Sequence, residues 1–159
     1  RQDEWEAMTN GDLKKAANAI DLRFKQCKYQ TLVHGDAKPA NFCFTSDFKN
    51  VAAVDFQYVG RGCGMKDLVY LMSSTLSEEE LFLQDQNIIN EYFILLKKSL
   101  QHFSIPDVNF EELRTEWADC YSMAWSDFYR FLSGWNSSSN RVNKYMELQV
   151  DSALHKLAR

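Results

Sequence analysis

The chain has 159 residues, of which 45% are hydrophobic and 25% charged, and its net charge is −4. This length suits one domain with a sizeable core, and the acidic balance argues against a nucleic-acid-binding surface, which is normally basic. No apolar run approaches the roughly 20 residues that cross a bilayer, and residues 1–5 are too polar for a signal peptide. We therefore expect a cytoplasmic protein with neither a nucleic-acid nor a membrane partner.

Helical periodicity comes first along the chain, and β-like runs follow it. Apolar residues spaced three and four apart predict a helix over residues 12–28. Short β-like runs then occupy residues 31–34, 42–44 and 51–56, with a hairpin-type connection at 46–50. The glycine-rich stretch at 60–64 lacks the spacing of a phosphate-binding loop, so we interpret it as a flexible connection.

The second half is helical. A short helix is predicted over 67–76, and a capping box at Ser77 and Glu80 opens another that runs to about residue 102. Asn109 and Glu112 begin a third, whose apolar stripe continues to residue 131. A polar linker at 136–140 precedes a last helix over 141–158. The pattern indicates an α+β fold, with a mostly helical body and a small β-hairpin platform.

The four cysteines, at positions 27, 43, 63 and 120, have no C-x-x-C spacing. The sequence therefore predicts neither a zinc site nor a disulfide framework. Cys43 lies in an apolar run, and Cys27 and Cys120 fall on apolar faces of helical segments. We interpret them as small core residues in a reducing compartment.

The most informative stretch is H-G-D-A-K-P-A-N at residues 34–41, followed by V-D-F-Q at residues 54–57. Phosphoryl transfer needs an oriented nucleophile, bound metal ions and neutralised phosphate charge. Asp36 suits the first task, because a carboxylate accepts or orients the proton of an attacking hydroxyl. Asn41 and Asp55 suit the second, since magnesium takes oxygen ligands. Lys38 could supply positive charge near the transferred phosphate, and a solvated lysine without that contact is the equally open alternative.

Two neighbouring residues would shape the same loop. Gly35 permits backbone angles that other residues resist, and the His34 imidazole can hydrogen-bond the loop or the Asp55 segment. For His34 the structural role is favoured, and a catalytic role stays open. Together these residues predict a magnesium-dependent phosphotransferase site.

The runs H-G-D-A-K-P-A-N, V-D-F-Q and K-D-L-V-Y-L resemble the C-terminal lobe of the aminoglycoside phosphotransferase and choline kinase group. Within it, D-F-Q and the later D-F-Y-R-F-L-S-G-W look most similar to ecdysteroid-kinase-like proteins. The resemblance implies a protein-kinase-like fold, ATP and Mg²⁺ as cofactors and a small-molecule hydroxyl as acceptor. It also implies that Asp36 is the catalytic base, that Asn41 and Asp55 are metal ligands, and that Asp67 braces the catalytic loop.

Some features depart from protein kinases. Gln57 stands where they have glycine, and the H-G-D opening lacks the arginine that reads a phosphorylated activation loop. The stretch from 57 to 66 is too short for a long activation segment. Lys38-Pro39 is the protein-kinase form of the loop, so the loop alone leaves the substrate type open. The balance favours small molecules over a protein-kinase lobe.

Residues 1–31 contain no G-x-G-x-x-G and no strand lysine like that of V-A-I-K. We therefore expect residues 1–159 to be a C-terminal catalytic lobe whose partner is an N-terminal nucleotide-binding lobe missing from this chain, and to be inactive alone. The alternative is a non-catalytic binding or scaffold module. The upstream coding sequence would distinguish the two.

The acceptor would be recognised in the helical half. Trp125, Tyr129 and Trp135 lie off the apolar stripe and, with Asp127 and Asp119, are candidates for lining a substrate pocket. His102 and His155 lack partners at metal-ligand spacing and are expected at the surface. Nothing in the sequence identifies the acceptor or the oligomeric state.

Overall fold

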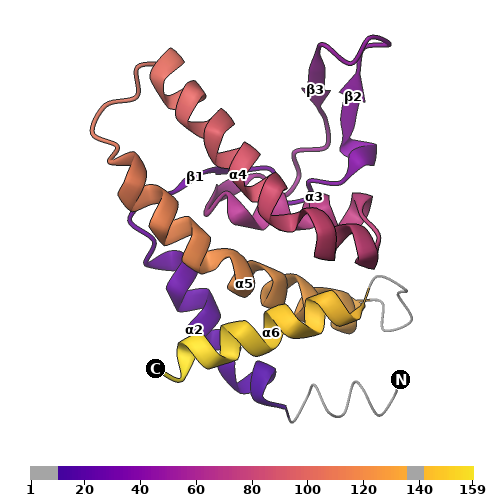
Figure 1. The fold of residues 1–159 in the computed structure, drawn as a ribbon, viewed down its shortest axis with the longest axis vertical. Helices are drawn as coiled ribbons and strands as arrows, with labels where there is room; N and C mark the ends of the chain where they lie inside the picture. The colour runs from indigo at the N-terminus through magenta and orange to yellow at the C-terminus, as the bar shows by residue number, and fades with distance from the viewer. Residues whose placement is uncertain (1–10, 136–141) are drawn as a thin grey trace.

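A computed structural model describes residues 11–135 and 142–159 of the chain. Its helices form the body of the molecule (Figure 1). They are α2 (Asp12–Lys25), α3 (Met65–Thr75), α4 (Glu78–His102), α5 (Phe110–Trp135) and α6 (Lys144–Leu157). Among these described helices none is both long and apolar enough to cross a membrane.

Two small antiparallel sheets complete the fold. Strand β1 (Thr31–Val33) pairs with β4 (Gly60–Gly62), and β2 (Phe42–Phe44) pairs with β3 (Val51–Ala53), after a 3-10 turn at Pro39–Asn41. The predicted α+β architecture, mostly helical with a small hairpin, is confirmed.

The glycine-rich stretch is not the flexible connection that the sequence indicated. Residues 60–62 form strand β4, in register with β1 from Thr31 opposite Gly62 to Val33 opposite Gly60. A side chain at Gly62 would come within 3.2 Å of the Val33 side chain. Small residues therefore let this backbone approach its partner strand closely enough to pair.

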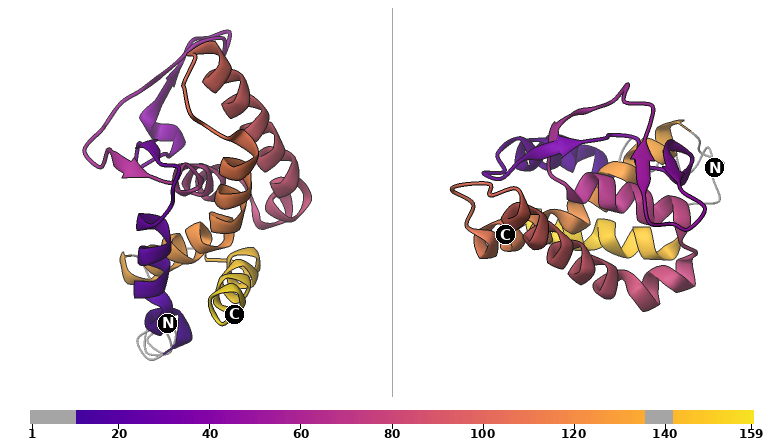
Figure 2. Two further views of the ribbon diagram at one scale, coloured as in Figure 1. Left: turned by 90° about the vertical axis from the view of Figure 1, so that its left-hand side faces the viewer. Right: turned by 90° about the horizontal axis from the view of Figure 1, so that it is seen from above.

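Helix α5 lies at the centre of the core and contacts α2, α3 and α6. Figures 1 and 2 show α6 lying alongside it. Its buried face carries Trp117 and Trp125, which meet Met65 of α3, Leu81 of α4 and Met146 of α6 in one cluster. This core supports the platform that carries residues 34–41.

Local capping determines where the helices begin. The Ser77 hydroxyl accepts the Glu80 N–H at 3.3 Å, and the Glu80 carboxylate accepts the Ser77 N–H at 2.8 Å, so the predicted capping box is confirmed. The Asn143 side chain caps α6 through the N–H of Met146. The last helix therefore begins at Lys144, three residues later than predicted. The predicted linker at 136–140 lies outside the described residues.

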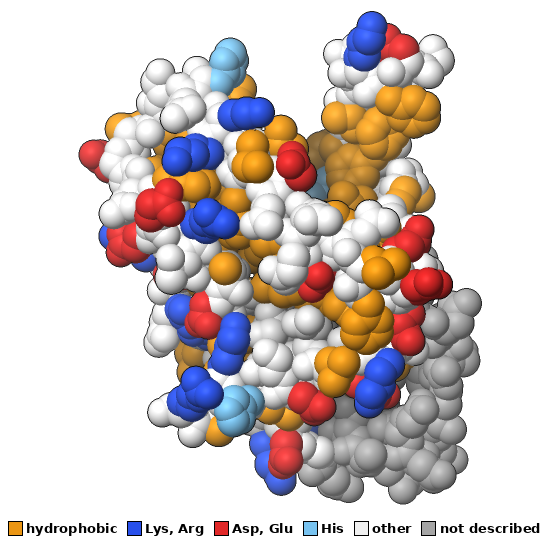
Figure 3. Space-filling view, viewed as in Figure 1, with side chains coloured by type: hydrophobic (Ala, Val, Ile, Leu, Met, Phe, Trp, Pro, Cys, Tyr) orange, Lys and Arg blue, Asp and Glu red, His pale blue; other side chains and the backbone are white. Residues whose placement is uncertain are grey.

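The β2–β3 hairpin stands away from the helical body and carries exposed apolar side chains (Figure 3). Phe44, Phe48 and Val51 are more than half exposed. Cys43 is also exposed, so its expected place in the core is wrong. The physical reason is that these strands pair only with each other, and no described helix covers them.

Candidate functional site

Asp67 ties residues 34–41 to the helical body. It lies in the first turn of α3, and its carboxylate accepts the backbone N–H groups of His34 at 2.6 Å and Gly35 at 3.0 Å. Charge-assisted bonds of this kind are about twice as strong as neutral ones. The start of the loop is thereby held in one position relative to α3.

Gly35 has a left-handed backbone conformation, with φ of 79°. A side chain there would collide with the backbone carbonyl of Tyr58, in the segment that follows Asp55. Only glycine meets both conditions without strain. The close approach brings the loop and the Asp55 segment into direct contact.

His34 links the same two segments. Its Nε2 lies 2.9 Å from the carbonyl oxygen of Val54, and its Nδ1 lies 3.3 Å from the N–H of Asp36. Because a carbonyl only accepts, Nε2 carries the proton, and Nδ1 is left to accept from Asp36. With both ring nitrogens engaged, His34 positions Asp36 and the residue before Asp55.

Asp36 is buried, with 5% of its surface exposed, and it is surrounded by donors. Lys38 Nζ and Asn41 Nδ2 lie 2.7 and 2.9 Å from its Oδ2. Burial alone would raise the pKa of Asp36, but hydrogen bonds from Lys38, Tyr70 and Asn41 together hold it below its usual value. The carboxylate therefore stays ionised.

Asn41 and Asp55 present oxygen atoms that the protein does not use. The Asn41 amide nitrogen bonds Asp36, while its Oδ1 accepts no hydrogen bond from the described residues. The Asn41 carbonyl accepts the N–H of Val54 at 2.9 Å, which places the next residue, Asp55, beside the loop. Asp55 is exposed and pairs with none of the described residues. An amide oxygen and a carboxylate fit a magnesium ion.

Tyr70 is a site residue that the sequence analysis did not identify. Its side chain lies close enough to the Asp36 carboxylate to help lower the pKa of that group, and its ring packs edge-on against that of Phe128 of α5, with ring centroids 4.6 Å apart. The spacing could have identified it, because Tyr70 follows Asp67 by three residues and therefore lies on the same face of α3. Tyr70 connects the loop to the core.

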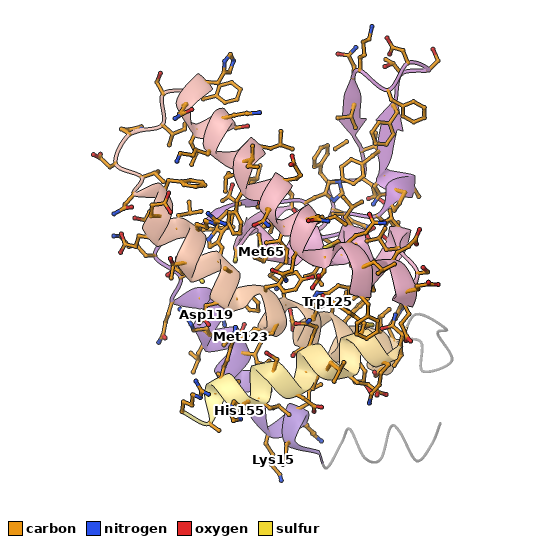
Figure 4. The ribbon with its side chains drawn as sticks, viewed as in Figure 1. Lys15, Met65, Asp119, Met123, Trp125 and His155 are labelled. Carbon is orange, nitrogen blue, oxygen red and sulfur yellow. The ribbon has the colours of Figure 1, made fainter. Side chains whose placement is uncertain are left out.

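The structure does not gather the predicted substrate residues on one surface. Trp125 has no exposed surface and packs edge-on against Tyr121 and Tyr145, so in this structure it belongs to the core (Figure 4). Trp135 is 76% exposed and stacks on Phe131. Tyr129 is half-buried, so its exposure is intermediate between those of Trp125 and Trp135.

The two acidic candidates are neutralised by neighbours. Asp127 pairs with Lys66 at 3.1 Å and Arg130 at 2.8 Å. Asp119 pairs with Arg23 and Lys156. Burial tends to raise the pKa of both carboxyls, but these cations hold it below the usual value. Neither acid offers unpaired negative charge to a cationic acceptor. His102 and His155 are exposed, as predicted.

A cavity of about 350 Å³ lies between the strands and helices α3 and α4. Most of its lining is apolar, including Val33, Phe42 and Leu68, and His34 and Asp67 are also among the lining residues. Asp36, Asn41 and Asp55 do not line it. The cavity therefore borders the residues that anchor the loop, and it is separate from the predicted reaction centre.

Comparison of the sequence with known protein families finds a match that includes these site residues. Residues 3–105 match the Ecdysteroid kinase-like family. The chain has no match among curated proteins or among solved structures. The matched stretch contains the whole loop together with Asp55, Asp67 and Tyr70, and it covers more than half of the chain. The chain therefore belongs to the ecdysteroid kinase-like family.

Proposed function

We propose that this chain is the catalytic lobe of a phosphotransferase that moves the γ-phosphate of ATP to a hydroxyl group of a small molecule. Family membership supports a kinase-like phosphotransferase fold. The observation that carries the proposal is the arrangement around Asp36: a buried, ionised carboxylate shares a rigid loop with Asn41, and the unpaired Asp55 lies beside them.

Asp36 would orient the acceptor. Its lowered pKa keeps it ionised but makes it a weak base, so it would accept a hydrogen bond from the hydroxyl, align it and take its proton late in the transfer. A late proton transfer suits the loose transition state of phosphoryl transfer, in which bond formation to the nucleophile lags behind bond cleavage.

Asn41 and Asp55 would hold magnesium, which when bound neutralises charge on the phosphate oxygens. Lys38, 38% exposed and paired with Asp36, would extend positive charge towards the incoming phosphate. His34, Asp67 and Tyr70 contact the loop or Asp36 and would act as positioning residues. Such support matters because small misplacements at a reaction centre lower rates strongly.

The test is magnesium-dependent ATP consumption across a panel of hydroxyl-bearing small molecules. It uses the chain itself and a version extended upstream along its coding sequence. Asp36→Asn should lower turnover by about 10²–10⁴-fold while magnesium-dependent nucleotide binding survives. Asp47→Asn, on the exposed tip of the β2–β3 hairpin, is the matched control and should behave like the unaltered chain.

Near-normal turnover by Asp36→Asn would remove Asp36 from the reaction. If neither version of the chain binds ATP with magnesium or turns it over, a non-catalytic binding module becomes the better hypothesis for the function of this chain.

A further inference from the structure

Three of the four cysteines meet inside the core, although their spacing in the sequence gave no sign of it. Cys27 follows α2, Cys63 precedes α3 and Cys120 lies in the middle of α5. Their sulfur atoms all lie within 4.8 Å of one another, and those of Cys27 and Cys120 are 3.5 Å apart. At 4%, 0% and 0% exposed, all three are buried.

The spacing of these sulfurs suits a metal ion. With metal–sulfur bonds of about 2.3 Å, the sulfurs of a tetrahedral or trigonal site lie about 3.8–4.0 Å apart. The observed separations, 3.5 Å for one pair and within 4.8 Å for all three, bracket that range. Side-chain shifts of less than about 1 Å would bring all three separations into that range.

A cation lies beside the cluster. Arg23 precedes Cys27 by one helical turn, and its backbone carbonyl oxygen accepts a hydrogen bond from the Cys27 sulfur at 3.4 Å. Its guanidinium pairs at 3.3 Å with Asp119, the residue next to Cys120. Positive charge at this position would offset part of the negative charge that three thiolates bring into the core.

A disulfide explains the cluster less well. It would require the sulfurs of Cys27 and Cys120 to close from 3.5 Å to about 2.05 Å, and it would leave Cys63 unused. It would also need an oxidant with access to a buried pair. A metal ion uses all three sulfurs and asks for less movement.

We propose that Cys27, Cys63 and Cys120 form a buried three-thiolate site for a soft, thiophilic metal ion. On binding, each thiol releases its proton to solvent and one sulfur–metal bond forms in its place, with no transfer of electrons. The described residues supply three clustered ligands, whereas structural zinc sites almost always have four. Copper(I), which thiolates also select, is therefore the first ion to test, and zinc the second.

The site would join three parts of the fold. It links the residue that follows α2, the middle of α5 and the residue before the N-cap of α3. The first turn of α3 carries Asp67. Figure 4 labels Met65 in this turn and Asp119, the residue next to Cys120. Because Asp67 holds the backbone of His34 and Gly35, the metal would stabilise the position of α3 and, through it, the start of the loop at residues 34–41. This inference does not depend on the proposed phosphotransfer.

The test titrates the fully reduced chain with copper(I), supplied as its acetonitrile complex without oxygen, and separately with zinc chloride. Binding is measured against a competing chelator. One ion per chain is expected, with a rise in thermal midpoint. Cys63→Ser and Cys120→Ser should weaken binding by more than the 10–100-fold typical of losing an outer-shell partner. Cys43→Ser, altered at the exposed cysteine, is the matched control and should bind normally.

X-ray absorption on the unaltered chain avoids any folding defect of the variants. Three sulfur neighbours at about 2.3 Å, around whichever ion binds, would support the site and identify its metal. The proposal is overturned if neither ion binds, if nitrogen or oxygen ligands dominate the spectrum, or if binding survives in Cys63→Ser and Cys120→Ser.

Discussion

The loop at residues 34–41 and the segment around Asp55 lie in contact, yet they are built in opposite ways. Asp36 and Asn41 are each 5% exposed and bonded to each other, and the start of their loop is bonded to Asp67. Asp55 is exposed, has a left-handed φ of 63°, and forms no hydrogen bond or ion pair within the described part of the chain.

This difference separates two requirements of a phosphotransfer site. A residue that orients the nucleophile works best when the protein already satisfies and positions it. A metal ligand must keep an oxygen atom available, as Asn41 does with its Oδ1 inside the loop and Asp55 does with its exposed carboxylate. The left-handed conformation of Asp55 costs about 1–2 kcal/mol, and non-glycine residues of this kind cluster at functional sites. The comparison leads to four predictions.

The largest effect on stability is expected from Gly35→Ala. The left-handed φ and the collision with the Tyr58 carbonyl should together lower the free energy of unfolding by about 2–5 kcal/mol. Urea denaturation followed by circular dichroism would measure it. Gly60→Ala is the matched control, since a side chain there comes no closer than 4.0 Å to Tyr58. Equal stability of the two variants would refute the role of Gly35.

Asp67→Ala should come next. It leaves the N–H groups of His34 and Gly35 without their charged acceptor, at a cost of about 2–3 kcal/mol. Amide hydrogen exchange at these two residues should also accelerate. Asp47→Ala removes a carboxylate that likewise accepts two hydrogen bonds, from Thr45 and Lys49, but at an exposed turn. A loss as large in Asp47→Ala would show that the position of Asp67 has no special importance.

A smaller, pH-dependent effect is expected for Lys38→Met. Because the folded-state pKa of Asp36 is below its unfolded value, its interactions stabilise the fold above about pH 4 and are lost as the pH falls through the folded-state pKa. At pH 7 the variant's free energy of unfolding should be lower by at most about 1 kcal/mol, since Lys38 is partly exposed. This deficit should shrink below about pH 4.

The comparison for this experiment is Lys98→Met, at an exposed position on α4 that forms no ion pair with the described residues. Denaturation at a series of pH values would measure both variants. A deficit for Lys38→Met that stays constant down to pH 2 would contradict the role assigned to its pair with Asp36.

The smallest effect on stability has the opposite sign. Asp55→Gly relieves the left-handed backbone and should stabilise the fold by up to about 1 kcal/mol, while removing magnesium-dependent nucleotide binding. Ser104→Gly relieves a similar φ of 50° far from the loop in sequence and should stabilise without affecting binding. Calorimetry with ATP and magnesium would separate the two. Unchanged nucleotide affinity in Asp55→Gly would exclude Asp55 as a ligand.

The start of α4 was predictable because its chemistry is local. The Ser77 and Glu80 capping box joins residues three apart, so the sequence alone contains the whole interaction. The pairing of β1 with β4 joins Thr31 to Gly62, and nothing near either residue specifies the other. The exposure of Cys43 was missed for a similar reason: an apolar strand is buried only if another element covers it.

The sequence by itself determined which residues carry candidate chemistry. Asp36 and Asn41 share one short loop, and Asp55 follows the next β-like run, so their types and spacing already pointed to phosphate and magnesium. Tertiary structure alone decided the distant partners: Asp67 and Tyr70 around the loop, Trp125 in the core, and three cysteines in one cluster. The chemistry of a motif lies in residues that are neighbours in the sequence, whereas contacts between residues far apart in the sequence depend on how whole helices pack.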